Sequence, residues 1–154
     1  MRRTRRLFAT ILSVALAGTL FTMPASAAPF ETFPIEYAFP VDNPCTGQET
    51  ELSLTGVVHV REQLTAGGTF HLLERFDATW TTADGFAGTA RQVVTVTDRN
   101  PGTFDDFVVH LTLHFIGRDA NGRVVQSREL FVLNLRDGDT IVQRERLTAR
   151  CSDR

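Results

Sequence analysis

The sequence FHLLERFDATWTTADGFAGTARQVVTVT, residues 70–97, contains two runs of alternating apolar and polar residues on either side of one turn. The apolar positions of the first run share one parity, as in a strand with one buried face: Phe70, Leu72, Phe76, Ala78 and Trp80. The turn contains Asp84-Gly85, a dipeptide typical of β-hairpins. With three-residue loops, Trp80 lies opposite Leu54 on one neighbouring strand and Gly88 on the other, so its ring covers a strand glycine.

The same pattern continues through most of the chain. Further turn signals occur at Gly67-Gly68, Asn100-Pro101-Gly102, Asn121-Gly122 and Asp137-Gly138. Between them we expect six strands, at about 49–65, 69–81, 86–97, 103–117, 123–136 and 140–151. No helix-length connection separates these strands, so neighbours should be antiparallel. The sequence therefore predicts an all-β fold, an antiparallel up-and-down meander closing into a small β-barrel or a strongly curled sheet.

The predicted strand at 123–136 has two alternative registers. Residues 130–133, Leu-Phe-Val-Leu, are apolar on both faces. A two-residue turn at Asn121-Gly122 would point Leu130 and Val132 inward. A bulge or a longer loop near Asp119 would instead point Phe131 and Leu133 inward.

The first residues have the three-part layout of a secretory signal peptide. Four Arg lie in residues 1–6, an apolar run follows to residue 21, and Ala25-Ser26-Ala27 is a typical cleavage site. Residues 4–8, Thr-Arg-Arg-Leu-Phe, also match part of a twin-arginine export signal. Both the Sec and the twin-arginine export routes therefore stay open. We expect residues 1–27 to be removed and the protein to be secreted.

Composition and charge restrict the partners. All 16 basic residues are Arg, against 18 Asp and Glu, and the net charge is −2. Because residues 1–27 hold four of those Arg and no acid, the chain from Ala28 onward has a net charge of −6. An acidic domain repels nucleic acids and anionic membranes, and no second apolar run is long enough for a membrane span. We expect a monomer without a nucleic-acid partner or a membrane span.

Cys45 and Cys151 are the only two cysteines, and a disulfide between them is expected in an oxidising compartment. A metal pair would need more ligands, and a redox pair would need C-x-x-C spacing. Six meander strands start and finish at the same end of a sheet, so this disulfide favours a last strand that returns beside the first and closes a barrel.

Residues 28–44 form a separate proline-rich and aromatic arm ahead of a barrel domain at 45–154. Phe33, Ile35, Tyr37 and Phe39 alternate on one face, while four prolines interrupt hydrogen bonding. The arm suits an edge strand or a cover over a barrel mouth. A disordered linker is the alternative.

Three acids on predicted inner faces are the candidate catalytic residues: Glu74, Glu129 and Glu145. A turn at 137–139 would make Glu129 and Glu145 diagonal neighbours, close enough for coupled titration or for the carboxylate pair of a glycosidase. Neutralisation by nearby arginines is the structural alternative. The histidines predict no metal site, because His110 and His114 lie about 13 Å apart on a strand.

Short motifs occur near both ends of this domain and in its middle: Asn43-Pro44-Cys45-Thr46-Gly47-Gln48, His110 with His114, Asn121-Gly122, and Cys151. Together they resemble an uncharacterised family of small secreted proteins of high-GC Gram-positive bacteria. That family has an N-x-C-T-G-[E/Q] start, His-bearing strands, an A-N-G turn and a terminal Cys. The resemblance covers residues 43–151 and implies a secreted all-β domain with one disulfide. It does not assign an activity to that domain.

Three functions follow as hypotheses. The leading one is a secreted, non-catalytic protein without a cofactor that binds a small apolar ligand, lined by Phe70, Phe76, Trp80, Phe107 and Phe131. The second is a carboxylate-dependent isomerase or hydrolase using the three glutamates. The third is a cell-envelope module that binds a protein through an outer face with His59, His71, His110 and His114.

Overall fold

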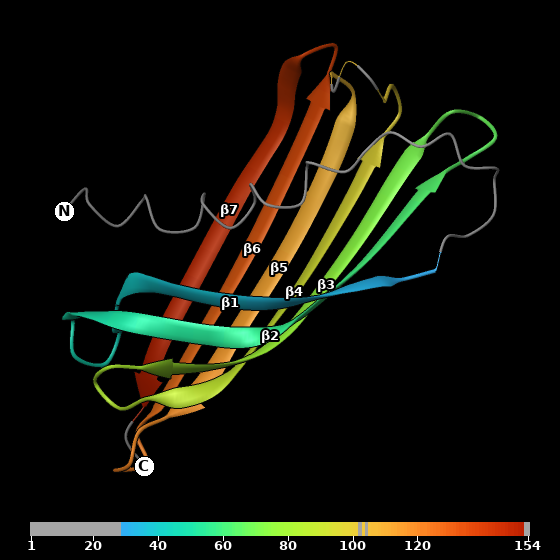
Figure 1. The fold of residues 1–154 in the computed structure, drawn as a ribbon. Coiled ribbons are helices and arrows are strands. Elements are labelled where there is room, and N and C mark those ends of the chain that lie inside the picture. The colour runs from blue at the N-terminus through green and yellow to red at the C-terminus, as the bar shows by residue number, and fades with distance from the viewer. Residues whose placement is uncertain (1–28, 102, 104, 153–154) are drawn as a thin grey trace.

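The computed structural model describes residues 29–101, 103 and 105–152, which form one antiparallel sheet (Figure 1). Its strands are β1 (Glu31–Asp42), β2 (Glu49–Leu64), β3 (Phe70–Thr82), β4 (Ala87–Asp98), β5 (Phe107–Arg118), β6 (Val124–Arg136) and β7 (Asp139–Ser152). Each strand pairs with the next one in the sequence. The predicted all-β meander is confirmed, and the described part of the chain contains no helix. The predicted signal peptide, residues 1–27, lies outside the described residues.

The strand boundaries agree closely with the alternation pattern, with one exception. The strand expected to begin at 103 begins at Phe107. Its first residues instead belong to a loop in which Thr103 and Asn100 donate hydrogen bonds to the Asp105 carboxylate. The arm is an edge strand, since β1 pairs with β2 along its whole length.

The two-register segment in β6 is resolved by the loop before it. Arg118 pairs with Val124, so the connection is longer than a two-residue turn. The Asp119 carboxylate accepts hydrogen bonds from the Asn121 and Arg123 backbone amides and forms an ion pair with the Arg123 side chain. Phe131 and Leu133 therefore share a face with Leu111 and Val109, as the longer-loop alternative predicts.

One cross-strand row organises the sheet. Tyr37, Leu54, Trp80, Gly88, Gly117, Val125 and Cys151 lie opposite one another on successive strands. The predicted placement of Trp80 between Leu54 and Gly88 is confirmed. We call the face that carries Trp80 the inner face and the opposite one the outer face.

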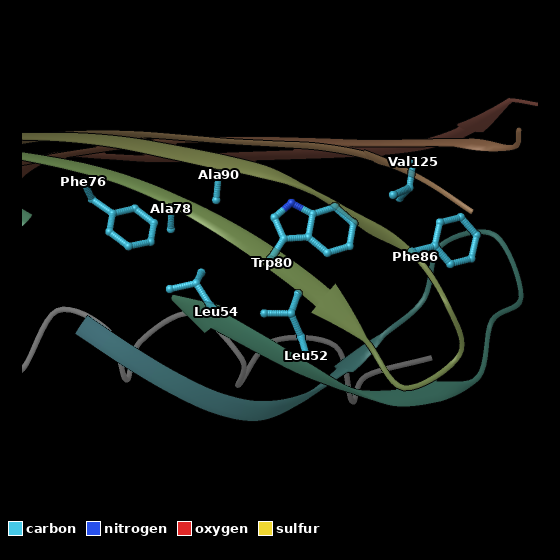
Figure 2. Close-up of a cluster of buried hydrophobic side chains, with 8 residues drawn as sticks. All are labelled: Leu52, Leu54, Phe76, Ala78, Trp80, Phe86, Ala90 and Val125. Atoms are coloured by element: carbon cyan, nitrogen blue, oxygen red, sulfur yellow. The ribbon is translucent and has the colours of Figure 1, made fainter. Parts of the chain in front are cut away.

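The sheet curls so that β1 and β2 lie across the inner face of the later strands (Figure 1). Figure 2 shows the side chains enclosed between these two layers, which are Leu52, Leu54, Phe76, Ala78, Trp80, Phe86, Ala90 and Val125. The Trp80 ring packs edge-on against Phe115, with ring centroids 6.1 Å apart. Its Nε1 donates a hydrogen bond of 3.0 Å to the Thr89 carbonyl oxygen, so the buried ring leaves no polar atom unpaired.

The curled sheet does not close into a barrel through hydrogen bonds. In the described residues, β1 and β7 are the two edges and do not pair with each other. The expected return of the last strand beside β2 is thus not observed, because β1 occupies that edge of β2. Pro34 and Pro40 lie in β1, and prolines are compatible with an edge strand because they lack the N–H that a further strand would need.

The Cys45–Cys151 disulfide joins the β1–β2 loop to the end of β7, as predicted, with a Cα–Cα distance of 5.1 Å. Asn43 organises that loop. Its Oδ1 accepts a hydrogen bond from the Cys45 amide, its carbonyl accepts one from the Gly47 amide, and its Nδ2 donates one to the Asp84 carboxylate. The N-x-C-T-G segment therefore holds the cysteine in position and ties it to the β3–β4 turn.

Asp84, in the β3–β4 turn, accepts hydrogen bonds from the β1–β2 hairpin, including the one from Asn43 Nδ2. Thr50 also donates to the Asp84 carboxylate. Burial alone would raise the pKa of Asp84, but hydrogen bonds from Thr82, Asn43 and Thr50 lower this pKa overall. The carboxylate form is therefore the one that stabilises the contact between the two turns.

Replacement of Gly117 by Ala should destabilise the protein by about 2–3 kcal/mol, because overpacking of a close-packed core is costly. A Cβ atom at Gly117 would overlap the Trp80 ring and the Ala87 carbonyl oxygen. Urea unfolding followed by the fluorescence of Trp80 measures the effect. Gly67→Ala is the matched control, because a Cβ there would meet only Thr65 Oγ1, at 3.8 Å. Equal stability of the two variants would contradict the tight packing under Trp80.

Removal of the disulfide should lower the free energy of unfolding by roughly 4–5 kcal/mol in the loop-entropy model. The two cysteines are separated by 106 residues, so the disulfide restricts a long loop of the unfolded chain. The measurement is urea unfolding of the oxidised protein and of Cys45→Ser/Cys151→Ser. A double variant as stable as the oxidised protein would show that the disulfide does not stabilise the sheet.

Candidate functional site

The candidate site is the inner face in the half of the sheet away from the disulfide. Two adjacent cross-strand rows define it, and both are apolar except for a band of polar side chains. The first row is Phe76, Gln92, Leu113, Glu129 and Leu147, and the second is Glu74, Val94, Leu111, Phe131 and Glu145. The β6–β7 register places Phe131 opposite Glu145 and Glu129 opposite Leu147, as predicted. The predicted turn at 137–139 is one residue shorter, because Arg136 pairs with Asp139, and a β-bulge between Asn134 and Leu135 makes up the difference.

Glu129 is the most unusual member of this band. Its residue is 8% exposed, and no described residue forms an ion pair or a side-chain hydrogen bond with it. Burial raises the pKa of Glu129, and the negative charge of Glu145 raises it further. The Glu129 carboxylate oxygens are not among the fully buried unpaired atoms, so the carboxylate is only partly removed from water, which is still unfavourable for its charged form. The fold therefore holds an acid on an apolar surface that would be stabilised by a proton or by a cation.

Glu74 lies on β3, on the other side of Gln92 from Glu129. Gln92 is buried, and its Nε2 donates a long hydrogen bond of 3.4 Å to Glu74 Oε1. Burial raises the pKa of Glu74. Of the three candidate catalytic glutamates, the sheet thus brings Glu129 and Glu145 together and leaves Glu74 three strands from Glu129.

The five aromatic residues expected to line one ligand site are divided between two regions. Phe76 and Trp80 belong to the buried core between the two layers. Phe70, Phe107 and Phe131 are half-buried, and Phe70 and Phe107 flank Asp98 in one cross-strand row. The physical reason is the curl, which packs β1 and β2 over Phe76 and Trp80, whereas Phe70, Phe107 and Phe131 lie outside this core cluster.

Two shallow grooves occur on the described surface, with volumes of about 500 Å³ and about 440 Å³. Thr55, Val57, Asp77, Arg91 and His114 contribute to the larger one, and Arg61, His71 and Thr97 to the smaller one. None of the five predicted aromatics and none of the three glutamates lines either groove. The inner-face site therefore lies outside both grooves, and it is open to water toward β7, where Glu145 and Leu147 are exposed.

The histidines are distributed over the outer face. His59 lies opposite Arg75 and His71 opposite Gln63, as the three-residue loop predicts. His114 Nε2 is 3.0 Å from Gln126 Nε2, and His110 is exposed. Among the described residues, no group of three His, Cys, Asp or Glu side chains is arranged to hold a metal ion. Likewise, no helix long and apolar enough to cross a membrane occurs there.

Asp98 is a buried acid that the sequence pattern did not single out. Its residue is fully buried, its Oδ1 accepts a hydrogen bond of 2.9 Å from the Asn100 amide, and Oδ2 has no hydrogen-bond partner in the described structure. The local signal for this arrangement is the Asp-x-Asn sequence before Pro101, which is typical of an Asx-turn. Asp98 terminates β4 and starts the loop to β5.

Comparison with known proteins gives no assignment: no protein-family model, curated protein or solved structure matches the chain. The candidate site is therefore interpreted from its own geometry.

Glu129→Gln should increase stability at neutral pH. The pKa of the Glu129 carboxyl is higher in the folded than in the unfolded protein. Folding is therefore most favourable at a pH below the pKa of the unfolded state, where the carboxyl is protonated, and the protein loses stability as the pH rises through the pKa of the folded state. The amide cannot ionise, so the melting temperature of the variant should exceed that of the wild type at pH 7 and equal it near pH 4. Glu36→Gln, at an exposed β1 position, is the charge-matched control. A Glu129→Gln variant less stable at pH 7 would show that the carboxylate is compensated in the folded protein.

Proposed function

We propose that the protein is an exported, non-catalytic binding protein whose open inner face holds an amphiphilic ligand. The ligand has an apolar body and a single cationic head. One observation carries this proposal: Glu129 lies on a largely apolar sheet face with its residue only 8% exposed, its carboxylate oxygens keep contact with water, and no described residue forms an ion pair with it. A ligand ammonium group beside Glu129 and Glu145 would remove the cost of burying that charge.

The surroundings of Glu129 supply the contacts for the apolar body. Leu111, Phe131 and Leu133 are half-buried on the same face, and Leu147 is 44% exposed beside Glu129. An apolar molecule laid along this face would cover side chains that water now reaches, which is favourable in proportion to the area covered. This refines the sequence hypothesis, because the ligand lies on an open surface and no enclosed cavity is needed.

Export is supported by the disulfide, which is typical of proteins that fold in an oxidising compartment. The predicted secretory signal at residues 1–27 supports the same location. The enzyme hypothesis has less support. Neither glutamate of the pair lines either described groove, whereas catalysis by carboxylates requires a site that excludes water and orients the substrate.

Dodecylammonium should bind the protein more tightly than dodecanol, and laurate should bind most weakly. Isothermal titration below the micelle concentration of each compound measures the three affinities. Glu129→Gln should weaken dodecylammonium binding about tenfold, as expected for loss of one charge-assisted contact of about 1.4 kcal/mol. Glu36→Gln removes the same charge from an exposed outer-face position and should leave the affinity unchanged.

Two results would contradict the proposal. Laurate binding as tight as that of dodecylammonium would show that Glu129 does not select the head group. Failure of all three compounds to bind would exclude the inner face as an amphiphile site. Native mass spectrometry of protein purified from culture supernatant identifies any endogenous ligand and reports the oligomeric state in the same spectrum.

A further inference from the structure

The outer face of β5, β6 and β7 is basic, although the chain as a whole is acidic. Arg128 on β6 and Arg144, Arg146 and Arg150 on β7 are all exposed. The register places Arg128 opposite Thr148 on this face, so Arg146 and Arg150 are its diagonal neighbours. No Asp or Glu occupies an outer-face position of β5 or β6, or of β7 after its first residue, Asp139.

These arginines lie close enough to repel one another. Alternate residues of a strand are about 7 Å apart, and diagonal cross-strand neighbours are about 7–8 Å apart. Both separations are within the screening length of roughly 8–10 Å at moderate salt. Within the described residues, the three ion pairs involve Arg91, Arg99 and Arg123, and none involves an arginine of this face. The cluster is therefore unneutralised in the isolated chain.

Exposed aliphatic side chains are interleaved with these arginines. Leu130 is 38% exposed on this face and lies opposite Arg146. Val93 and Ile116, each 42% exposed, extend the apolar part across β4 and β5. We call the exposed Arg128, Leu130, Arg144, Arg146 and Arg150, with Ile116 and Val93 beside them, the basic–aliphatic face.

We propose that the basic–aliphatic face docks the protein onto an anionic phospholipid surface. Arginine guanidinium groups bind lipid phosphates in bidentate fashion, and aliphatic side chains between them enter the boundary between head groups and acyl chains. A soluble polyanion would satisfy the arginines but would leave Leu130 and Ile116 in water. The combination of both side-chain types on one face therefore favours a lipid surface over a charged polymer.

The distribution of the acids is consistent with this orientation. Exposed acids are most numerous on β1 and β2, where they include Glu36, Asp42, Glu49 and Glu51. At the β7 edge, the exposed acids are Asp137 and Asp139 near the turn and Glu145 on the inner face. An anionic surface would repel that edge and attract β6 and β7, so the protein would approach with the basic–aliphatic face first. The proposal concerns the face opposite Glu129, so it does not depend on the amphiphile site.

The test is cosedimentation of the full-length disulfide-bonded protein with vesicles of phosphatidylglycerol and phosphatidylcholine in equal amounts. Every comparison is between proteins with the same N-terminus, confirmed by mass, so the four Arg of residues 1–6 contribute equally. Arg128→Gln/Arg146→Gln should lower partitioning about 25-fold, or roughly fivefold per arginine, which is the effect expected for a basic residue at an anionic surface. Leu130→Ser should lower partitioning about threefold through loss of apolar contact.

Arg61→Gln/Arg75→Gln is the matched control. It makes the same change in net charge on the outer face of β2 and β3, where both side chains stack on Phe30. The partitioning of this control variant onto vesicles should fall less than about threefold. Trp80 fluorescence confirms that all variants are folded.

Equal losses in the test and control pairs would overturn the proposal, since binding would then follow net charge alone. An unchanged Leu130→Ser variant, together with tight binding of inorganic polyphosphate, would also overturn it and indicate a soluble polyanion as the partner. Absence of vesicle binding by the wild type would exclude the lipid surface.

Discussion

The Cys45–Cys151 disulfide joins the two ends of a single sheet, and the rest of the structure depends on this constraint. Strands that follow one another in sequence make every backbone ladder, so hydrogen bonds alone would leave β1 and β7 free to separate. The cross-strand row through Trp80 and Gly117 ends at Cys151, and Cys45 links that point back to the β1–β2 loop. The disulfide thus holds the curl in which a one-layer sheet covers its own apolar face.

The curl has unequal effects along the strands. Near the disulfide, β1 and β2 cover Trp80, Phe76 and their neighbours, so these aromatics form a core (Figure 2). Toward the other end no second layer lies over the inner face in the described structure, and Phe131 and Leu147 remain partly exposed. The same face that supplies stability at one end is consequently available for binding at the other. Glu129 lies between these two regions, and no described residue forms an ion pair with it.

Much of the local structure could be predicted from sequence. The pairings of Trp80 with Gly88 and of His59 with Arg75 follow from parity and loop length, because a short loop determines which residues of a hairpin face each other. The predicted pairing of Phe131 with Glu145 is also found, but through a shorter loop and a β-bulge at Asn134/Leu135 that the sequence pattern did not predict. The register of β6 required a choice between two loops, and the Asp119 hydrogen bonds that decide it involve backbone amides that no hydropathy pattern reports. The predicted start of β5 at residue 103 was wrong for a similar reason, because hydrogen bonds from Asn100 and Thr103 to the Asp105 carboxylate form a loop there.

The arrangement of charges shows where sequence reasoning stops. A net charge of −6 for the chain from Ala28 onward predicts repulsion from anionic surfaces, but it is a sum over all faces. The sheet separates the charges, with exposed acids on β1 and β2 and an unneutralised arginine cluster on β6 and β7. Arg128 and Arg146 are distant in sequence and become neighbours only through the β6–β7 register.

By itself, the sequence determined the strands, the order in which they pair, most of their registers and the disulfide. These features depend on alternation and on loops of a few residues, which are local properties of the chain. Only the tertiary structure decided that the sheet stays open, that the five aromatics divide between a core and an exposed surface, and that one face is basic. These outcomes depend on how far the sheet curls, and curling is set by packing between strands that are far apart in the sequence, as at Trp80 and Gly117.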